Sequence, residues 1–295
     1  FLYVQFFIIK SNIMSYHKKL FQLFVLFYSI LFYSQLNTQD SLRGEFIYLL
    51  KAKLNTLNPN QTDEELFSLQ VADHRTFFSS LNSLKRDSVA GIVSRKAINN
   101  GGGVFDFRGT SMPQTKFSYT IIQTNENIQY FQRVAMSLLS YKESVIKDWK
   151  LIDETKIINT VNCKKAEVSY KGRNWTAWYS AEIPLPYGPY KFSGLPGLII
   201  KITDDKGDYD FELVRSVSNS KLKGRLVNIY ENRYTNSTET TKTELEKTLQ
   251  NFRENSLGIL ESLGTSVTPE QRKIIMERQK EMQLRKKGDN PIELN

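Results

Sequence analysis

Short segments in which apolar and polar side chains alternate recur along residues 43–234 of this chain. In one of them Ala166, Val168 and Tyr170 are separated by polar residues, and residues 209–213 repeat the pattern. This period of two is typical of a strand that has one face on a core and the other in water. Similar alternation predicts further strands at residues 46–54, 67–71, 116–123 and 225–234.

Residues 198–202 are almost continuously apolar, which predicts a strand covered on both faces. Many short strands with turns between them, and no amphipathic helix among them, favour antiparallel pairing. We therefore expect an α+β fold that is mainly antiparallel β, with a curved sheet forming a sandwich or an open barrel and a C-terminal helical segment.

The helical prediction rests on a change of period near the C-terminus. Apolar residues recur at spacings of three, four and seven from Leu245 to Leu263, as in an amphipathic helix. Thr268, Pro269 and Gln271 then provide a helix cap, a proline at the first helical position and an amide three residues after the cap. A second, highly charged helix is predicted to begin there and to end near Gly288.

The first part of the chain has the pattern of a secretory signal peptide. Two lysines follow Met14, residues 20–32 are almost wholly apolar, and the small residue Ser34 follows Tyr33. The apolar run is shorter than the roughly 20 residues that span a bilayer. We expect cleavage between Ser34 and Gln35. An uncleaved membrane anchor is the alternative, because bulky aromatic residues precede the expected cut.

These patterns divide the chain into three predicted parts. A leader at residues 1–34 consists of residues upstream of Met14 and the signal peptide, a β-rich domain occupies residues 35–236, and a helical tail occupies residues 237–295. The protein is therefore expected to be exported, periplasmic or secreted, with no stable membrane span after signal cleavage.

The charge distribution argues against a nucleic-acid partner. The chain has 40 basic and 31 acidic residues, and three lysines lie in the leader, which has no acidic residue. The remaining 37 basic residues are interleaved with the acidic ones, apart from short runs such as residues 285–287, so no continuous basic stripe for phosphates is present.

The residues that usually carry catalysis or bind metals are sparse. Cys163 is the single cysteine, and His74 is the one histidine after the leader, so neither a disulfide nor a zinc site of these ligands is expected. A nucleophile–base pair of His74 with Ser79 lacks a nucleophile elbow. We predict no catalytic residue, no metal site and no cofactor, and an enzyme is the less favoured interpretation.

Four aspartates cluster around Gly207, at positions 204, 205, 208 and 210. They allow either a calcium loop or a hairpin turn. A calcium loop needs several oxygens converging on the ion, and the spacing lacks the terminal bidentate glutamate. We favour the hairpin turn, between Ile202 and Tyr209.

The best candidate for ligand contact is the segment that contains Arg173, Trp175, Trp178 and Tyr179. On a strand Trp175 and Tyr179 share one face and Trp178 lies on the other, so at least one indole is expected outside the main core. An exposed tryptophan beside Arg173 suits stacking on a sugar or contact with a peptide. The alternative is packing under a covering loop at residues 187–198.

A second distinctive segment is Gly194-Leu195-Pro196-Gly197-Leu198-Ile199. Proline presets φ and glycine takes the positive φ of a type II turn, which predicts such a turn at residues 195–198 leading into the following strand. This loop is either a docking site or a structural corner with Leu195, Leu198 and Ile199 in the core, and we favour the corner.

These six residues match the motif of the GLPGLI family, exported proteins of bacteria with an outer membrane, which the chain resembles. Further segments resemble the same family, at residues 149–151, 156–158, 163–166, 172–173, 177–179, 182–184 and 290–294. The resemblance covers most of the chain after the leader. It implies an exported, β-rich protein without an established activity, and it assigns no catalytic residues.

Three functions remain open. The leading prediction is a non-enzymatic binding or accessory protein of the cell envelope, with a peptide, glycan, lipid or protein partner. The alternatives are an envelope hydrolase that uses carboxylates such as the aspartates near Gly207, and a structural protein of envelope assembly. A surface aromatic site favours the first, paired carboxylates in a cleft the second, and an apolar patch on the helical tail the third.

Overall fold

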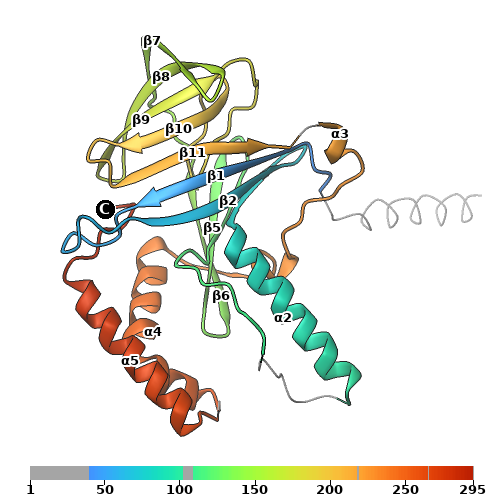
Figure 1. Ribbon diagram of the computed structural model, residues 1–295, viewed down its shortest axis with the longest axis vertical. Helices are drawn as coiled ribbons and strands as arrows, with labels where there is room; N and C mark the ends of the chain where they lie inside the picture. The colour runs from blue at the N-terminus through green and yellow to red at the C-terminus, as the bar shows by residue number, and fades with distance from the viewer. Residues whose placement is uncertain (1–39, 102–108, 218, 265, 295) are drawn as a thin grey trace, which may run out of the picture. The chain divides into compact units, whose positions relative to one another are not determined.

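A computed structural model describes residues 40–101, 109–217, 219–264 and 266–294 (Figure 1). The chain divides into two units between Asp40 and Ser41, and the described residues belong almost entirely to the second, Ser41–Asn295. The predicted leader and its cleavage site lie outside the described residues.

Twelve strands of the described chain form one sheet in the order β12-β6-β5-β4-β3-β2-β1-β11-β10-β9-β8-β7. Their bounds are β1 Gly44–Ala52, β2 Asp63–Val71, β3 Thr76–Ser80, β4 Thr120–Gln123, β5 Asn127–Val134, β6 Ser137–Ser144, β7 Lys150–Ile158, β8 Val161–Tyr170, β9 Arg173–Ser180, β10 Leu198–Asp204, β11 Tyr209–Ser216 and β12 Thr238–Glu239. Neighbouring strands are antiparallel, except that β12 runs parallel to β6. The sheet is curved and open, with β12 and β7 at its two edges, which confirms the predicted fold class.

Five helical segments accompany the sheet in the described residues. They are α2 Leu81–Asn99, α3 Asn219–Leu222, the 3₁₀ segment η1 Glu231–Arg233, α4 Lys242–Ser262 and α5 Pro269–Lys286. The two C-terminal helices were predicted, and Thr268 and Gln271 form the expected reciprocal cap with 3.0 and 3.3 Å hydrogen bonds. No helix of the described chain has the length and apolar character needed to cross a membrane.

Helix α2 is a departure from the prediction, which expected no helix among the strands. Its apolar residues do not form a clear stripe: the buried residues are Ser83, Val93 and Ala97. The helix begins because the Ser80 hydroxyl accepts a hydrogen bond from the Ser83 amide, which satisfies one of the unpaired donors of the first turn. The start of α2 is therefore explained by this capping hydrogen bond and not by an amphipathic pattern.

Two strand predictions were wrong in extent or in kind. Residues 225–234 form an isolated bridge between Leu226 and Ser41 and then η1, while Ile229 is buried in a small apolar cluster. The alternating pattern in this segment results from the packing of a loop and not from the pairing of a strand. In the predicted strand 116–123 pairing starts at Thr120, because the Thr115 hydroxyl bonds the amide and carbonyl of Phe117 and holds a turn.

The main core lies on one face of the sheet and is rich in aromatic rings. Phe67 and Phe78 stack with centroids 4.8 Å apart, and Trp175 lies 4.6 Å from Phe192, which belongs to the loop between β9 and β10. Both faces of β10 are largely buried, as predicted. The loop between β9 and β10 therefore covers the core face of β9, and this arrangement positions the candidate site.

Candidate functional site

Strand β9 carries all four residues predicted to contact a ligand, and it divides them between two faces. Arg173, Trp175 and Tyr179 lie on the core face and are 4%, 2% and 3% exposed. Trp178 lies on the opposite face and is half-buried. This division follows from the alternation of side chains along a strand.

Trp175 is covered by the chain itself. Its ring packs against Phe192, and its indole N–H donates to the Tyr170 carbonyl at 3.3 Å. The covering segment at residues 187–198 was the predicted alternative to ligand contact, and on this face of β9 the segment covers the indole. The buried indole therefore packs in the core of this structure.

Trp178 has different surroundings on the outer face of the sheet. Its cross-strand neighbours are Lys165 on β8 and Lys201 on β10. The ammonium group of Lys156 lies 5.7 Å from the centroid of the indole. We call these four residues, Trp178, Lys156, Lys165 and Lys201, the Trp178 platform.

Two of the three lysines of the platform, Lys165 and Lys201, form ion pairs with carboxylates. Lys165 pairs with Glu154 at 3.1 Å and Glu167 at 3.2 Å. Lys201 pairs with Asp210 at 3.0 Å and Glu212 at 2.6 Å. The aromatic ring thus lies between two sets of alternating charges, each of which offers hydrogen-bond donors and acceptors next to an apolar surface.

Arg173 is directed into the protein rather than toward the platform. Its guanidinium donates to Asp204 at 2.6 Å, to the side chain of Asn290 at 2.5 Å and to the carbonyl of Pro291 at 2.7 Å. Asp204 also accepts the amide hydrogens of residues 208 and 209. Arg173 therefore ties β9 to the β10–β11 hairpin and to the C-terminal segment.

The aspartates near Gly207 form the predicted hairpin turn. The Gly207 amide donates to the Asp204 carbonyl at 3.0 Å, with φ of 64° at Gly207. Asp204 and Asp208 face Arg173, and Asp210 pairs with Lys201. No group of three or more His, Cys, Asp or Glu side chains in the described chain is arranged to hold a metal ion.

The structure does not bring His74 and Ser79 together as a nucleophile–base pair. Ser79 is buried in β3, and its hydroxyl donates to the Tyr119 carbonyl at 3.2 Å. His74 lies on the exposed turn before β3. The Ser79 hydroxyl thus takes part in holding β3 beside the segment that leads into β4.

The Gly194–Ile199 motif forms a structural corner. Leu195, Leu198 and Ile199 are buried, as predicted. Gly197 has a φ of 154°, and a Cβ there would lie 2.1 Å from the Ser180 carbonyl oxygen. The hydrogen bond of the predicted type II turn is absent, because the Leu198 amide donates to Ile183 and the Gly197 amide to Leu195. Glycine is required by close backbone approach as well as by its positive φ.

A buried charge cluster was missed by the sequence analysis. Lys191 is fully buried in the loop between β9 and β10, and its ammonium group lies 2.5 Å from both Glu143 and Glu293. The Tyr141 hydroxyl is 2.8 Å away, and the rings of Tyr130, Tyr141 and Tyr190 lie within cation–π distance. No motif in the sequence singles out this lysine, because its partners come from β6 and from the end of the chain.

The cluster sets the protonation of its groups. Burial alone raises the pKa of Glu293, but the charge of Lys191 and hydrogen bonds from Lys191, Lys242 and Tyr190 outweigh it, so the pKa lies below its usual value. Burial raises the pKa of the Tyr141 and Tyr190 phenols, which stay protonated and available as donors. The arrangement is a neutralised, buried ion cluster that fixes the C-terminal segment.

Comparison with known proteins adds little about activity. Residues 142–201 match the model of a family described as a protein of unknown function, Porph_ging. The matched segment includes β7 to β9 and the motif Gly194–Ile199 on which the predicted resemblance mainly rests. A search of curated proteins finds no match.

Two solved structures described as PNGF-II, in the P21 and C2 space groups, resemble the chain at 15% and 13% identity. The TM-scores are 0.44 and 0.45, with 71% of this chain covered in each case and 34% and 33% of the other chain. This chain thus spans about a third of the length of those structures. Over residues 142–201, the chain is similar to a protein family of unknown function.

Proposed function

We propose that this protein is an exported, non-enzymatic binding protein of the cell envelope that holds a glycan on the Trp178 platform. The observation that carries the proposal is the half-exposed indole of Trp178 on the charged outer face of the sheet. The other three predicted contact residues, Arg173, Trp175 and Tyr179, are engaged in the core.

The chemistry of the platform suits a sugar ring. An indole offers a flat apolar surface on which the C–H face of a sugar can stack. The lysine–carboxylate pairs on both sides of the ring offer donors and acceptors for hydroxyl groups. A peptide is the alternative ligand of this surface, because backbone amides and carbonyls need the same donors and acceptors.

The test compares Trp178→Ala with Leu66→Ala, which removes an exposed apolar side chain from β2 of the same sheet. Both variants and the unaltered protein are applied to an array of envelope glycans and to an array of peptides. Trp178→Ala is expected to lose binding and Leu66→Ala to keep it. Equal binding by all three proteins would refute the platform, and binding to peptides alone would change the ligand class.

Export is part of the proposal and has its own test. The basic start, apolar run and small residue before position 35 support a cleaved signal peptide. N-terminal sequencing of the protein recovered from the periplasm or medium is expected to begin near Gln35. Recovery of the intact leader from a membrane fraction would favour the anchor instead.

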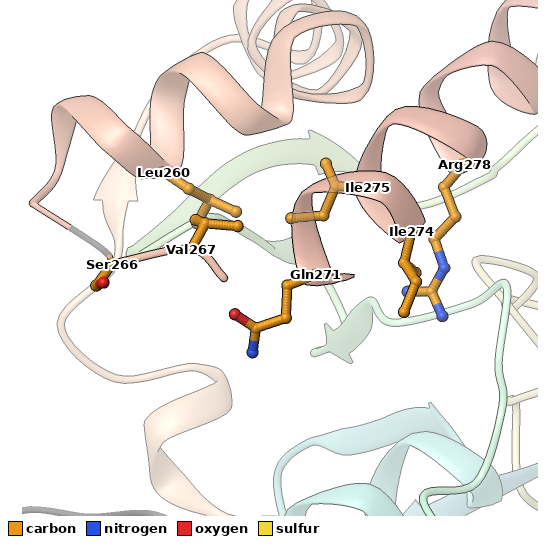
Figure 2. A pocket seen from close by; sticks show the side chains of 7 residues that line it. All are labelled: Leu260, Ser266, Val267, Gln271, Ile274, Ile275 and Arg278. Carbon is orange, nitrogen blue, oxygen red and sulfur yellow. The ribbon is translucent and has the colours of Figure 1, made fainter. Parts of the chain in front are cut away.

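A second candidate function is supported by the helical tail. A groove of about 300 Å³ is lined by residues of α4, of α5 and of the turn between them. Figure 2 shows that Leu260 and Val267 point toward Ile275 across this groove. Ile274, also at this groove, is 44% exposed. An apolar surface on the tail supports a structural contact in envelope assembly. Ile274→Asp should then abolish cross-linking to envelope proteins, with Lys273→Asp as the control.

The hydrolase alternative has less support. Its candidate carboxylates already serve other roles, since Asp204 and Asp208 face Arg173 and Asp210 pairs with Lys201. A general acid or base needs a carboxyl group within reach of a bound substrate.

A further inference from the structure

A second pocket lies between α2, β4, β5 and η1, away from the Trp178 platform. It has a volume of about 270 Å³ and is lined mainly by polar side chains. Three arginines reach it from three elements: Arg86 from α2, Arg133 from β5 and Arg233 from η1. One carboxylate, Asp87, also lines it, so the lining carries more positive than negative charge.

Arg233 is held rigidly at this pocket. Its guanidinium pairs with Asp87 and donates to the Ser83 hydroxyl at 2.6 Å and to the Ser83 carbonyl at 3.0 Å. A weaker contact of 3.4 Å reaches the Thr120 hydroxyl. The ion pair with Arg233 neutralises the charge of Asp87. Asp87 therefore does not neutralise Arg86 or Arg133.

Arg133 and Arg86 lie at the open side of the pocket. Arg133 is exposed, and its guanidinium is oriented by the carbonyls of Asn232 at 2.8 Å and Met136 at 3.2 Å. Carbonyl contacts orient a guanidinium without neutralising its charge. Arg86 is exposed on α2 and has no ion-pair partner among the described residues. Two cations thus face solvent around one opening.

The floor of the pocket differs from its rim. Phe131 and Leu138 are 3% and 9% exposed and give the floor an apolar patch, while the hydroxyls of Ser83 and Thr120 lie beside it. A cationic rim over a small apolar floor fits an organic molecule that carries an anionic group. Arginine binds phosphate, sulfate and carboxylate oxygens through paired N–H donors in one plane.

We propose that this pocket binds a small oxyanion, namely a phosphate, sulfate or carboxylate group carried on a body about the size of a monosaccharide. Arg86 and Arg133 contact the anion, Arg233 and Asp87 fix the pocket wall, and Phe131 contacts the apolar face of the body. The site is independent of the Trp178 platform, so either proposal stands if the other fails.

The test measures the dissociation constants of four compounds by calorimetry at constant ionic strength: inorganic phosphate, inorganic sulfate, glucose 6-phosphate and glucose. The proteins are the unaltered chain, Arg86→Ala and Arg95→Ala. Arg95 is an exposed arginine on the same helix and does not line the pocket, so its variant removes an equal charge. Neither side chain is buried, so both variants are expected to fold.

Glucose 6-phosphate should bind most tightly and glucose should not bind. Arg86→Ala should weaken the binding of glucose 6-phosphate by about tenfold, which corresponds to about 1.4 kcal/mol, while Arg95→Ala changes it little. Binding of inorganic phosphate equal to that of glucose 6-phosphate assigns the site to the free anion. The proposal is overturned if no anion binds, or if the two variants weaken binding equally.

Discussion

The ammonium group of Lys191 lies 2.5 Å from a carboxylate oxygen of Glu293, and the two residues are 102 positions apart in the sequence. Lys191 belongs to the loop that covers the core face of β9, and Glu293 belongs to the segment after α5. Their side chains are 0% and 6% exposed. The end of the chain is therefore bonded into the β-rich domain, although the sequence places it in a separate helical tail.

Glu293→Gln is expected to destabilise the protein strongly. Removing one partner of a buried ion pair leaves the other charge without compensation, at a cost of about 3–5 kcal/mol in general. Glu143 remains beside Lys191, so we expect the lower end of that range. Urea unfolding measures the change, with Glu254→Gln as the control, because the Glu254–Lys286 pair is exposed to solvent and should contribute little to stability. If Glu293→Gln and Glu254→Gln lowered the unfolding free energy equally, the proposed structural role of the buried Glu293 would be contradicted.

The same pair predicts a dependence of stability on pH. The pKa of Glu293 is lower in the folded protein than its ordinary value of 4.5. The folded state therefore binds the proton less well than the unfolded state, and the stability that Glu293 contributes is present above pH 4.5. That contribution is lost as the pH falls through the lowered pKa. The difference in unfolding free energy between the unaltered protein and Glu293→Gln should shrink below pH 4.5, and a constant difference would contradict this.

Gly197→Ala is expected to destabilise the protein by about 3 kcal/mol or more. Backbone strain at a positive φ and overpacking each cost about 1–3 kcal/mol, and the new Cβ would meet the Ser180 carbonyl oxygen. Gly91→Ala is the control, since the nearest atom to a Cβ there is the end of the Arg95 side chain at 3.7 Å. That change in a helix should stabilise by about 0.5–1 kcal/mol. Denaturant unfolding of both variants measures the difference. Equal unfolding free energies for Gly197→Ala and Gly91→Ala would contradict the close approach of Gly197 to the Ser180 carbonyl.

The melting temperature is expected to be unchanged by a chelator and by a reductant. Cys163 is a free, buried cysteine, and burial raises the pKa of its thiol and disfavours the reactive thiolate. The described core is held together by apolar packing and by buried ion pairs such as Arg173–Asp204 and Lys191–Glu293. A large loss of stability with chelator alone would favour the calcium alternative for the aspartates near Gly207.

Part of the sheet could be predicted because strands such as β8, β9 and β11 have one buried face and one more exposed face. In β11 the residues Tyr209, Phe211 and Leu213 are buried and alternate with more exposed ones, as the period of two indicated. Helix α2 could not be predicted in this way, because its contact with the sheet is short and its few buried residues include the polar Ser83. Residues 225–234 were wrongly predicted to form a strand, because Val227 and Ile229 pack into an apolar cluster while Leu226, Asn228 and Tyr230 are exposed, as on a strand.

The candidate site was predictable only in part. Alternation along β9 correctly separated Trp178 from Trp175, and the loop at residues 187–198 was identified as a possible cover. The role of Arg173 could not be foreseen, because its partners Asp204 and Asn290 lie 31 and 117 positions away. Ion pairs between distant residues produce no periodic pattern in a sequence. Arg173 was therefore predicted to contact a ligand, although its side chain is bonded in the core.

The two tryptophans of β9 should respond differently to truncation. Trp175→Ala removes a buried ring that packs against Phe192 and is expected to cost about 3–5 kcal/mol. Trp178→Ala removes a half-buried ring on the outer face, whose contact with Lys156 contributes about 0.5–1 kcal/mol at an exposed site. Urea unfolding of both variants measures the difference.

This comparison also decides how the binding experiment is interpreted. If Trp178→Ala keeps most of its stability and loses glycan capture, the indole acts through its contact with the ligand. In that case the Trp178→Ala variant is folded, and it differs from the unaltered protein only at the outer face of β9. If both variants unfold severely, the outer face of β9 is part of a core, and the Trp178 platform is not a binding site. We expect Trp175 to be the more structural of the two, because its ring is enclosed by the loop that contains Phe192.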